Sequence, residues 1–84
     1  MILENDEIRA MFHRMESAQE KYGNFASAHE ALGVALEEWN ELQAAIHDNE
    51  LFSIESEALD LAAVLLRLAI QCRTSDSLQK RSVK

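Results

Sequence analysis

Two pairs of acidic residues in this chain have the spacing that can hold a metal ion. Glu38 and Glu41 stand three residues apart, and Glu57 and Asp60 repeat that spacing in the following segment. Side chains three residues apart are neighbours on one face of a helix. If both segments are helical, each pair can direct two carboxylates at a common ion.

Carboxylate oxygens on two antiparallel helices would form a cavity of hard donors, which is the environment that Mg²⁺ or Mn²⁺ prefers. Zinc is disfavoured because neither a cysteine nor a histidine at paired spacing accompanies the carboxylates. A di-iron site is disfavoured because those bundles use Glu-x-x-His pairs. We therefore expect a Mg²⁺ site, with Mn²⁺ as a possible substitute, whose ligands are Glu38, Glu41, Glu57 and Asp60.

The first acidic pair must be positioned by a helix that we predict over residues 28–48. Ser27 and Glu30 form a capping box ahead of it. Glu38 falls inside or at the margin of the apolar arc of this helix, whereas Glu37 points toward its polar side. Six positions form one apolar stripe: Leu32, Ala35, Leu36, Trp39, Leu42 and Ile46. We expect Trp39 on this stripe to be a core residue. Stacking of the tryptophan on a nucleobase is the alternative.

The second acidic pair belongs to a helix predicted over residues 54–73, with Ser53 as its candidate N-cap. This helix is apolar nearly all round, apart from Asp60 and Arg67. A carboxylate in that setting should be paired or bound to metal. We expect Arg67 to pair with Asp60 or with Glu57, and a role in binding phosphate stays open.

A further helix is predicted over residues 6–22, ended by Gly23, and a short polar tail over residues 74–84 follows the last helix. The chain then forms one all-α domain over residues 1–84. The polar face of the first helix has an ordinary solvated pattern, for which we predict no chemistry: Arg9, Arg14, Glu16, Glu20 and Lys21.

Composition sets limits on partners. The 84 residues carry a net charge of −7, which makes binding to nucleic acid or to an anionic membrane unfavourable. The longest apolar run, 61–66, is too short to span a bilayer, and no signal peptide precedes the first helix, so we expect a cytoplasmic protein. Three helices from one short chain can hardly enclose the helix predicted over residues 54–73, which is apolar nearly all round. We therefore predict a bundle completed by a homodimer or homotetramer.

The spacing of these residues resembles a known family. Glu37-Glu38-Trp39-Asn40-Glu41 is similar to the EExxE motif, and Glu57-Ala58-Leu59-Asp60 to the ExxD motif, of the MazG-like all-α nucleoside triphosphate pyrophosphohydrolases. The resemblance covers roughly residues 27–73. It implies a MazG-like helical bundle that hydrolyses a nucleoside triphosphate, with a deoxynucleotide as the expected substrate, to the monophosphate and pyrophosphate.

The resemblance also implies roles for single residues. Glu38, Glu41, Glu57 and Asp60 resemble the family's metal ligands, and Glu37 would orient the attacking water or support the ligands. Family members usually have a further helix with basic groups that hold the phosphates. Here eleven residues follow Arg73, and Lys80 and Arg81 could serve only if this tail folds back. The short tail favours the alternative function, a catalytically silent helical oligomer that acts as a binding or regulatory module.

Overall fold

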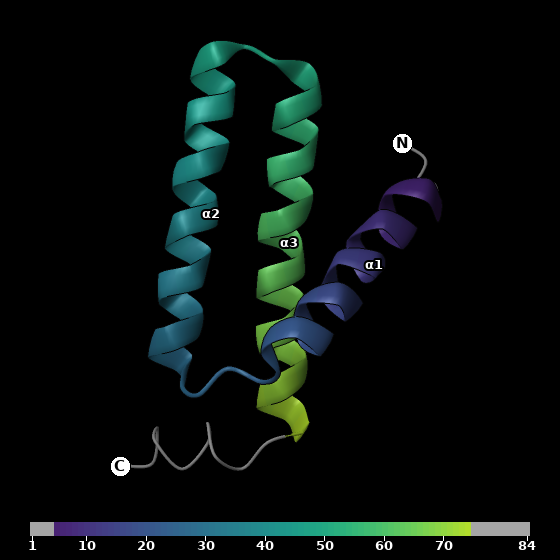
Figure 1. Cartoon of the computed structure of the whole chain (residues 1–84), viewed down its shortest axis with the longest axis vertical. Helices are drawn as coiled ribbons and strands as arrows, with labels where there is room; N and C mark the ends of the chain where they lie inside the picture. The colour runs from purple at the N-terminus through teal and green to yellow at the C-terminus, as the bar shows by residue number, and fades with distance from the viewer. Residues whose placement is uncertain (1–4, 75–84) are drawn as a thin grey trace.

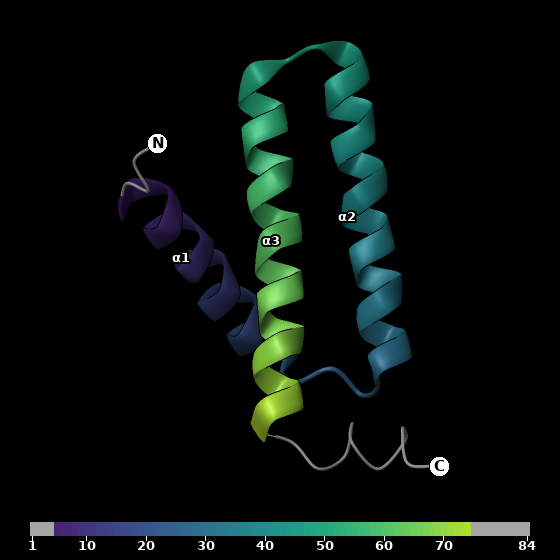
Figure 2. The same ribbon diagram turned by 180° about the vertical axis from the view of Figure 1, so that it is seen from behind.

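The computed structural model describes residues 5–74, and these form three helices: α1 (Asn5–Tyr22), α2 (Ala28–Asp48) and α3 (Leu51–Thr74). The all-α prediction is therefore confirmed for this part of the chain. Helices α2 and α3 form a long antiparallel hairpin, and α1 crosses α3 obliquely, in front of it in Figure 1 and behind it in Figure 2. The predicted tail beyond Thr74 lies outside the described residues.

The start of α2 follows the predicted capping box closely. The Ser27 hydroxyl accepts a hydrogen bond from the Glu30 backbone N–H at 3.1 Å. The Glu30 carboxylate accepts one from the backbone N–H of Ala26 at 2.6 Å, one residue before the usual partner. Two exposed backbone donors are thereby satisfied, and α2 begins at the predicted residue.

The connection between α2 and α3 is shorter than predicted. Asn49 has a φ of 57° in the left-handed region, and its N–H bonds back to the Ile46 carbonyl at 3.0 Å. The N-cap prediction for Ser53 was wrong, because Glu50 accepts hydrogen bonds from both the backbone N–H and the hydroxyl of Ser53, each at 3.1 Å. Helix α3 therefore begins at Leu51, three residues earlier than expected.

The buried core is small and lies where the three segments meet. Phe25 of the α1–α2 connection, Ala31 of α2 and Val64 of α3 form it, with Val34, Ala35 and Leu68 packed against them. Gln71 fixes the connection, since its side-chain amide accepts from the Phe25 N–H at 2.9 Å and donates to the Phe25 carbonyl at 2.8 Å. This amide gives both polar groups of a buried peptide segment a partner.

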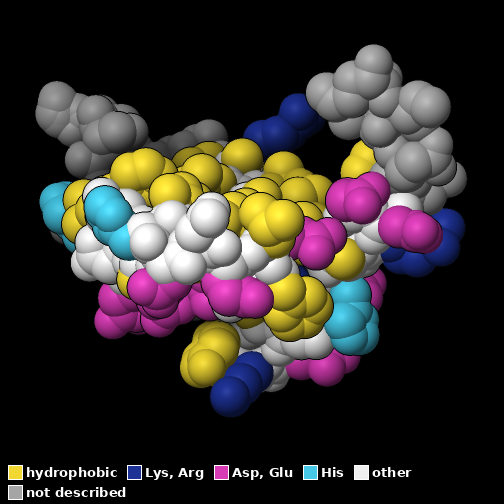
Figure 3. Space-filling view, turned by 90° about the horizontal axis from the view of Figure 1, so that it is seen from above, with side chains coloured by type: hydrophobic (Ala, Val, Ile, Leu, Met, Phe, Trp, Pro, Cys, Tyr) yellow, Lys and Arg dark blue, Asp and Glu magenta, His cyan; other side chains and the backbone are white. Residues whose placement is uncertain are grey.

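Much of the predicted apolar stripe of α2 is exposed in the single chain, and Trp39 is not part of the buried core described above. Trp39 keeps 46% of its surface accessible. By helical periodicity, Leu32, Leu36 and Ile46 lie on the same side of α2 as Trp39. The exposed Leu65 of α3 lies on this side of the hairpin too, which is the side opposite α1. In Figure 3 hydrophobic side chains gather along one side of the molecule. We call this surface the apolar face: Leu32, Leu36, Trp39, Ile46 and Leu65.

Candidate metal centre

Glu38 is directed toward α3 by its place on α2. Ala31 and Ala45 lie seven residues before and after it on the same stripe, and both are buried at the α2–α3 contact. Small side chains at these two positions leave room for the longer glutamate between the helices. The prediction that Glu38 lies within the buried arc is confirmed, since its side chain is half-buried.

The structure brings together carboxylates from both predicted pairs. One oxygen of each of Glu38, Glu41 and Glu57 lies within 4.8 Å of the other two. Glu41 is exposed, whereas Glu38 and Glu57 are half-buried. We call these three residues the carboxylate cluster. Three of the four predicted ligands thus meet at the α2–α3 contact.

The electrostatics of the cluster are those of crowded, partly buried acids. Burial raises the pKa of Glu38 from 4.5 to about 7, helped by the negative charges of Glu41, Asp60 and Glu57 and by a hydrogen bond to Glu41. Burial also raises the pKa of Glu57, with the charge of Glu41 as the next cause. One oxygen of Glu38 and one of Glu57 are fully buried without a hydrogen-bond partner among the described residues. No described donor satisfies these two oxygens, although the positive charge of Arg14 partly offsets the rise in the pKa of Glu57.

Asp60, the fourth predicted ligand, lies outside the cluster and is engaged by α1. The Nη1 atom of Arg14 lies 3.3 Å from the Asp60 carboxylate and donates a hydrogen bond to the Ser56 carbonyl at 2.7 Å. Asp60 is less buried than the apolar residues around it suggested, with 38% of its side chain exposed. The prediction that the polar face of the first helix is merely solvated was wrong for Arg14.

Arg67 does not pair with an acid, and the expectation of an ion pair with Asp60 or Glu57 was wrong. Its guanidinium donates to the Gly23 carbonyl at 2.9 Å and to the Gln19 side chain at 3.3 Å. It also lies over the Phe25 ring, 4.5 Å from the centroid. Arg67 is 8% exposed, and it ties the α1–α2 connection to α3.

A hollow of about 630 Å³ opens beside the cluster, between the end of α1, the α1–α2 connection and the first turns of α2. Its lining includes Glu37 and Glu38 of α2, Tyr22 at the end of α1, Phe25 of the connection, and Arg67 of α3. Glu37 is exposed, as its helical angle predicts. Because Glu38 belongs to both, the hollow and the carboxylate cluster are continuous.

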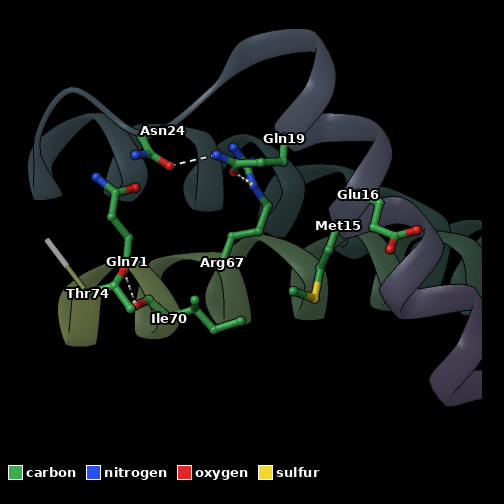
Figure 4. Close-up of a pocket in the computed structure, with 8 residues that line it drawn as sticks. All are labelled: Met15, Glu16, Gln19, Asn24, Arg67, Ile70, Gln71 and Thr74. Carbon is green, nitrogen blue, oxygen red and sulfur yellow. Dashed lines mark hydrogen bonds between the residues drawn. The ribbon is translucent and has the colours of Figure 1, made fainter.

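A second hollow, of about 320 Å³, lies on the other side of Arg67, between α1 and the last turns of α3. Figure 4 shows Met15 directed into it and Arg67 donating to Gln19, whose amide in turn reaches Asn24. Glu16 is the one acid of its lining, so this hollow lacks a group of carboxylates. We assign it no ligand.

The ion pair of Arg14 was not predicted because its partner, Asp60, lies 46 residues away in the sequence. A signal was present, since Arg14 stands three residues after Met11 and four before Ala18, both of which are half-buried against α3. A basic residue next to a packing stripe is placed at the rim of the helix contact. The predicted phosphate-binding residues Lys80 and Arg81 lie outside the described residues.

The chain matches no protein-family model, and no curated protein and no solved structure shows significant similarity to it. Within residues 5–74, no helix combines the length and the apolarity that crossing a bilayer requires.

Proposed function

We propose that the carboxylate cluster is the divalent-cation site of a nucleoside triphosphate pyrophosphohydrolase. The observation that carries the proposal is the convergence of Glu38, Glu41 and Glu57, whose oxygens lie within 4.8 Å of one another. Buried oxygens of Glu38 and Glu57 have no partner in the described chain, and a cation would satisfy both. A donor set made only of carboxylates suits Mg²⁺, or Mn²⁺ in its place.

The motif spacing supports the class of reaction. The run from Glu37 to Glu41 and the run from Glu57 to Asp60 resemble the MazG-like motifs, which implies that water adds across the anhydride between the α- and β-phosphates. The products are a nucleoside monophosphate and pyrophosphate. A bound divalent cation shields phosphate charge and lowers the pKa of water. We propose that Glu37, an exposed acid in the lining of the neighbouring hollow, orients that water or accepts its proton.

The large hollow suits the nucleoside part of the substrate. Its volume of about 630 Å³ is in the range of small-molecule sites. The carboxylates of Glu30, Glu37 and Glu38 repel phosphate but accept hydrogen bonds from a base or a sugar. Tyr22 and Phe25 add aromatic surface, on which a planar base can stack. We therefore place the polyphosphate at the cluster and the nucleoside in the hollow.

The apolar face supports self-association. Leu32, Trp39 and Ile46 repeat at seven-residue spacing along α2 and are each about half exposed. We propose that a second copy of the chain covers this face, so that two α2–α3 hairpins form a MazG-like four-helix bundle. Because the acidic side of each hairpin faces away from this contact, two chains of net charge −7 can associate through it. A homotetramer would need a second contact. A nucleotide substrate also fits the expected cytoplasmic location.

The direct experiment measures pyrophosphate release with Mg²⁺ across a panel of deoxynucleoside and ribonucleoside triphosphates. Glu38→Gln and Asp60→Asn should each lower the rate by about 100-fold or more, because Glu38 belongs to the cluster and Asp60 is the fourth expected ligand. Glu55→Gln is the matched control, since Glu55 is an exposed acid of α3 outside the cluster, and it should keep the wild-type rate. Equal rates in all three variants would refute the assignment.

The alternative function is a catalytically silent oligomer that binds a partner or regulates one. The observation that favours it is the ion pair between Arg14 and Asp60, which keeps one predicted ligand away from the cluster. A thermal shift separates the two. A pyrophosphohydrolase should melt at a higher temperature with Mg²⁺ and nucleotide, whereas a silent module should not respond to either.

A further inference from the structure

Arg14 brings positive charge to the edge of the carboxylate cluster. Its Nη1 atom lies 3.3 Å from Asp60 and donates to the Ser56 carbonyl at 2.7 Å, so one nitrogen of the guanidinium makes both contacts. Within residues 5–74 the hydrogen bond to Ser56 is the only one that the Arg14 side chain donates. The remaining N–H groups of the guanidinium fork are thus available to another acceptor.

The two contacts of Arg14 differ in how easily they are exchanged. The Ser56 carbonyl is a backbone acceptor within α3, so this contact does not depend on the carboxylate of Asp60. The ion pair is partly exposed, with 32% of the Arg14 side chain and 38% of the Asp60 side chain accessible, and ion pairs this exposed stabilise a protein only weakly. A stronger cation at Asp60 can therefore replace the guanidinium while the Ser56 contact keeps Arg14 at the site.

Charge balance at the site requires such a residue. A triphosphate brings several negative charges to three clustered carboxylates in a chain of net charge −7. Arg67 lines the neighbouring hollow, but it is 8% exposed and its N–H groups are engaged by Gly23 and Gln19. Arg14 is partly exposed, with 32% of its side chain accessible, and it adjoins Asp60.

We propose that Arg14 is a phosphate-binding residue that neutralises Asp60 in the free protein. When a divalent cation recruits Asp60, the guanidinium of Arg14 turns to an oxygen of the polyphosphate. The inference rests on the proposed function and adds a residue of α1 to its site. Arginine suits this role because its planar fork binds phosphate through two parallel hydrogen bonds. Substrate binding would then also draw α1 toward the α2–α3 hairpin.

The test is a calorimetric titration of two ligands, first Mn²⁺ alone and then the Mn²⁺ complex of inorganic triphosphate at saturating metal. For Arg14→Gln we expect Mn²⁺ to bind about threefold tighter or more, because Asp60 loses a competing cation. We expect the triphosphate complex to bind about tenfold weaker or more, because a charge-assisted hydrogen bond is lost. A purely structural role would not move these two affinities in opposite directions.

Two further variants complete the design. Arg9→Gln removes an arginine of the same helix whose ion pair with Asp6 lies at 3.9 Å and is highly exposed, and it should bind both ligands as the wild type does. Arg14→Lys keeps a point charge without the fork, so we expect unchanged Mn²⁺ binding and about threefold weaker triphosphate binding. This variant also decides the question if Arg14→Gln does not fold.

The inference is overturned if Arg14→Gln changes both affinities by less than twofold, or lowers both together. If Arg14→Gln does not fold, wild-type affinities in Arg14→Lys overturn it as well. A wild-type protein that binds no Mn²⁺ would instead remove the proposed function, and this inference with it. Opposite shifts in Arg14→Gln, with Arg9→Gln unchanged, support it.

Discussion

Replacement of Glu38 by glutamine should make the protein increasingly more stable than the wild type as the pH rises from 5 to 8. In the folded protein the pKa of Glu38 is raised to about 7, against 4.5 for an unperturbed glutamate. The folded state therefore holds a proton that the unfolded state has released between these two pH values. The stability linked to that proton is fully present below about pH 4.5 and is lost as the pH rises through about 7.

The size of this effect follows from the two pKa values. At full strength their difference corresponds to about 3 kcal/mol. Because Glu38 is partly exposed, solvent screens the interaction, and we expect about 1–2 kcal/mol. Glutamine carries no charge at any pH, so Glu38→Gln should gain this amount relative to the wild type between pH 5 and pH 8. A domain of this size gains about 4–8 °C in melting temperature for each kcal/mol.

The assay is thermal or urea unfolding of wild type and variant at several pH values from 5 to 8, without divalent ions and at one protein concentration. Glu37→Gln is the matched control, because it removes the neighbouring acid, which is exposed on α2. We expect its difference from the wild type to be constant across this range. A difference between Glu38→Gln and wild type that does not change with pH would refute the reasoning, and so would an equal trend in Glu37→Gln.

Three other substitutions test the fold around the site. Gln71→Ala leaves the N–H and carbonyl of Phe25 buried without a partner and should cost about 2–4 kcal/mol in urea unfolding, whereas Gln43→Ala, at an exposed position of α2, should cost less than about 0.5 kcal/mol. Ser27→Ala removes the cap of α2 and should cost about 1 kcal/mol, and no loss of stability would contradict the capping role. Trp39→Glu puts a charge on the apolar face and should convert the proposed dimer to a monomer in sedimentation velocity. An unchanged sedimentation coefficient would exclude this face as the contact.

Local chemistry predicts most of the helical boundaries. The Ser27 capping box places the start of α2 at the residue that the structure gives, because a cap acts within one helical turn. The same rule fails at α3, because Glu50 is a rarer cap than Ser53 and the left-handed Asn49 already turns the chain. The general preference of N-cap positions for serine does not decide whether Glu50 or Ser53 caps α3.

Helical geometry was enough to predict that Glu38 and Glu57 meet in the candidate site. The stripe shared by Ala31, Glu38 and Ala45 directs Glu38 at the neighbouring helix, and the hairpin brings Glu57 to meet it. The partner of Asp60 could not be predicted, because the angle at which α1 crosses α3 selects Arg14 over Arg67. The apolar stripe likewise predicts that Trp39 needs cover, but not that the described chain leaves it exposed.

Titration with Mn²⁺, followed by the paramagnetic resonance signal of the free ion, tests the central claim most directly, because it counts bound ions without any assumption about substrate. We expect the wild type and Glu55→Gln, which lacks an exposed acid of α3, to bind Mn²⁺ equally, and Glu57→Gln to bind it about tenfold or more weakly. Equal binding by all three proteins, or none by the wild type, would contradict a metal centre formed by Glu38, Glu41 and Glu57.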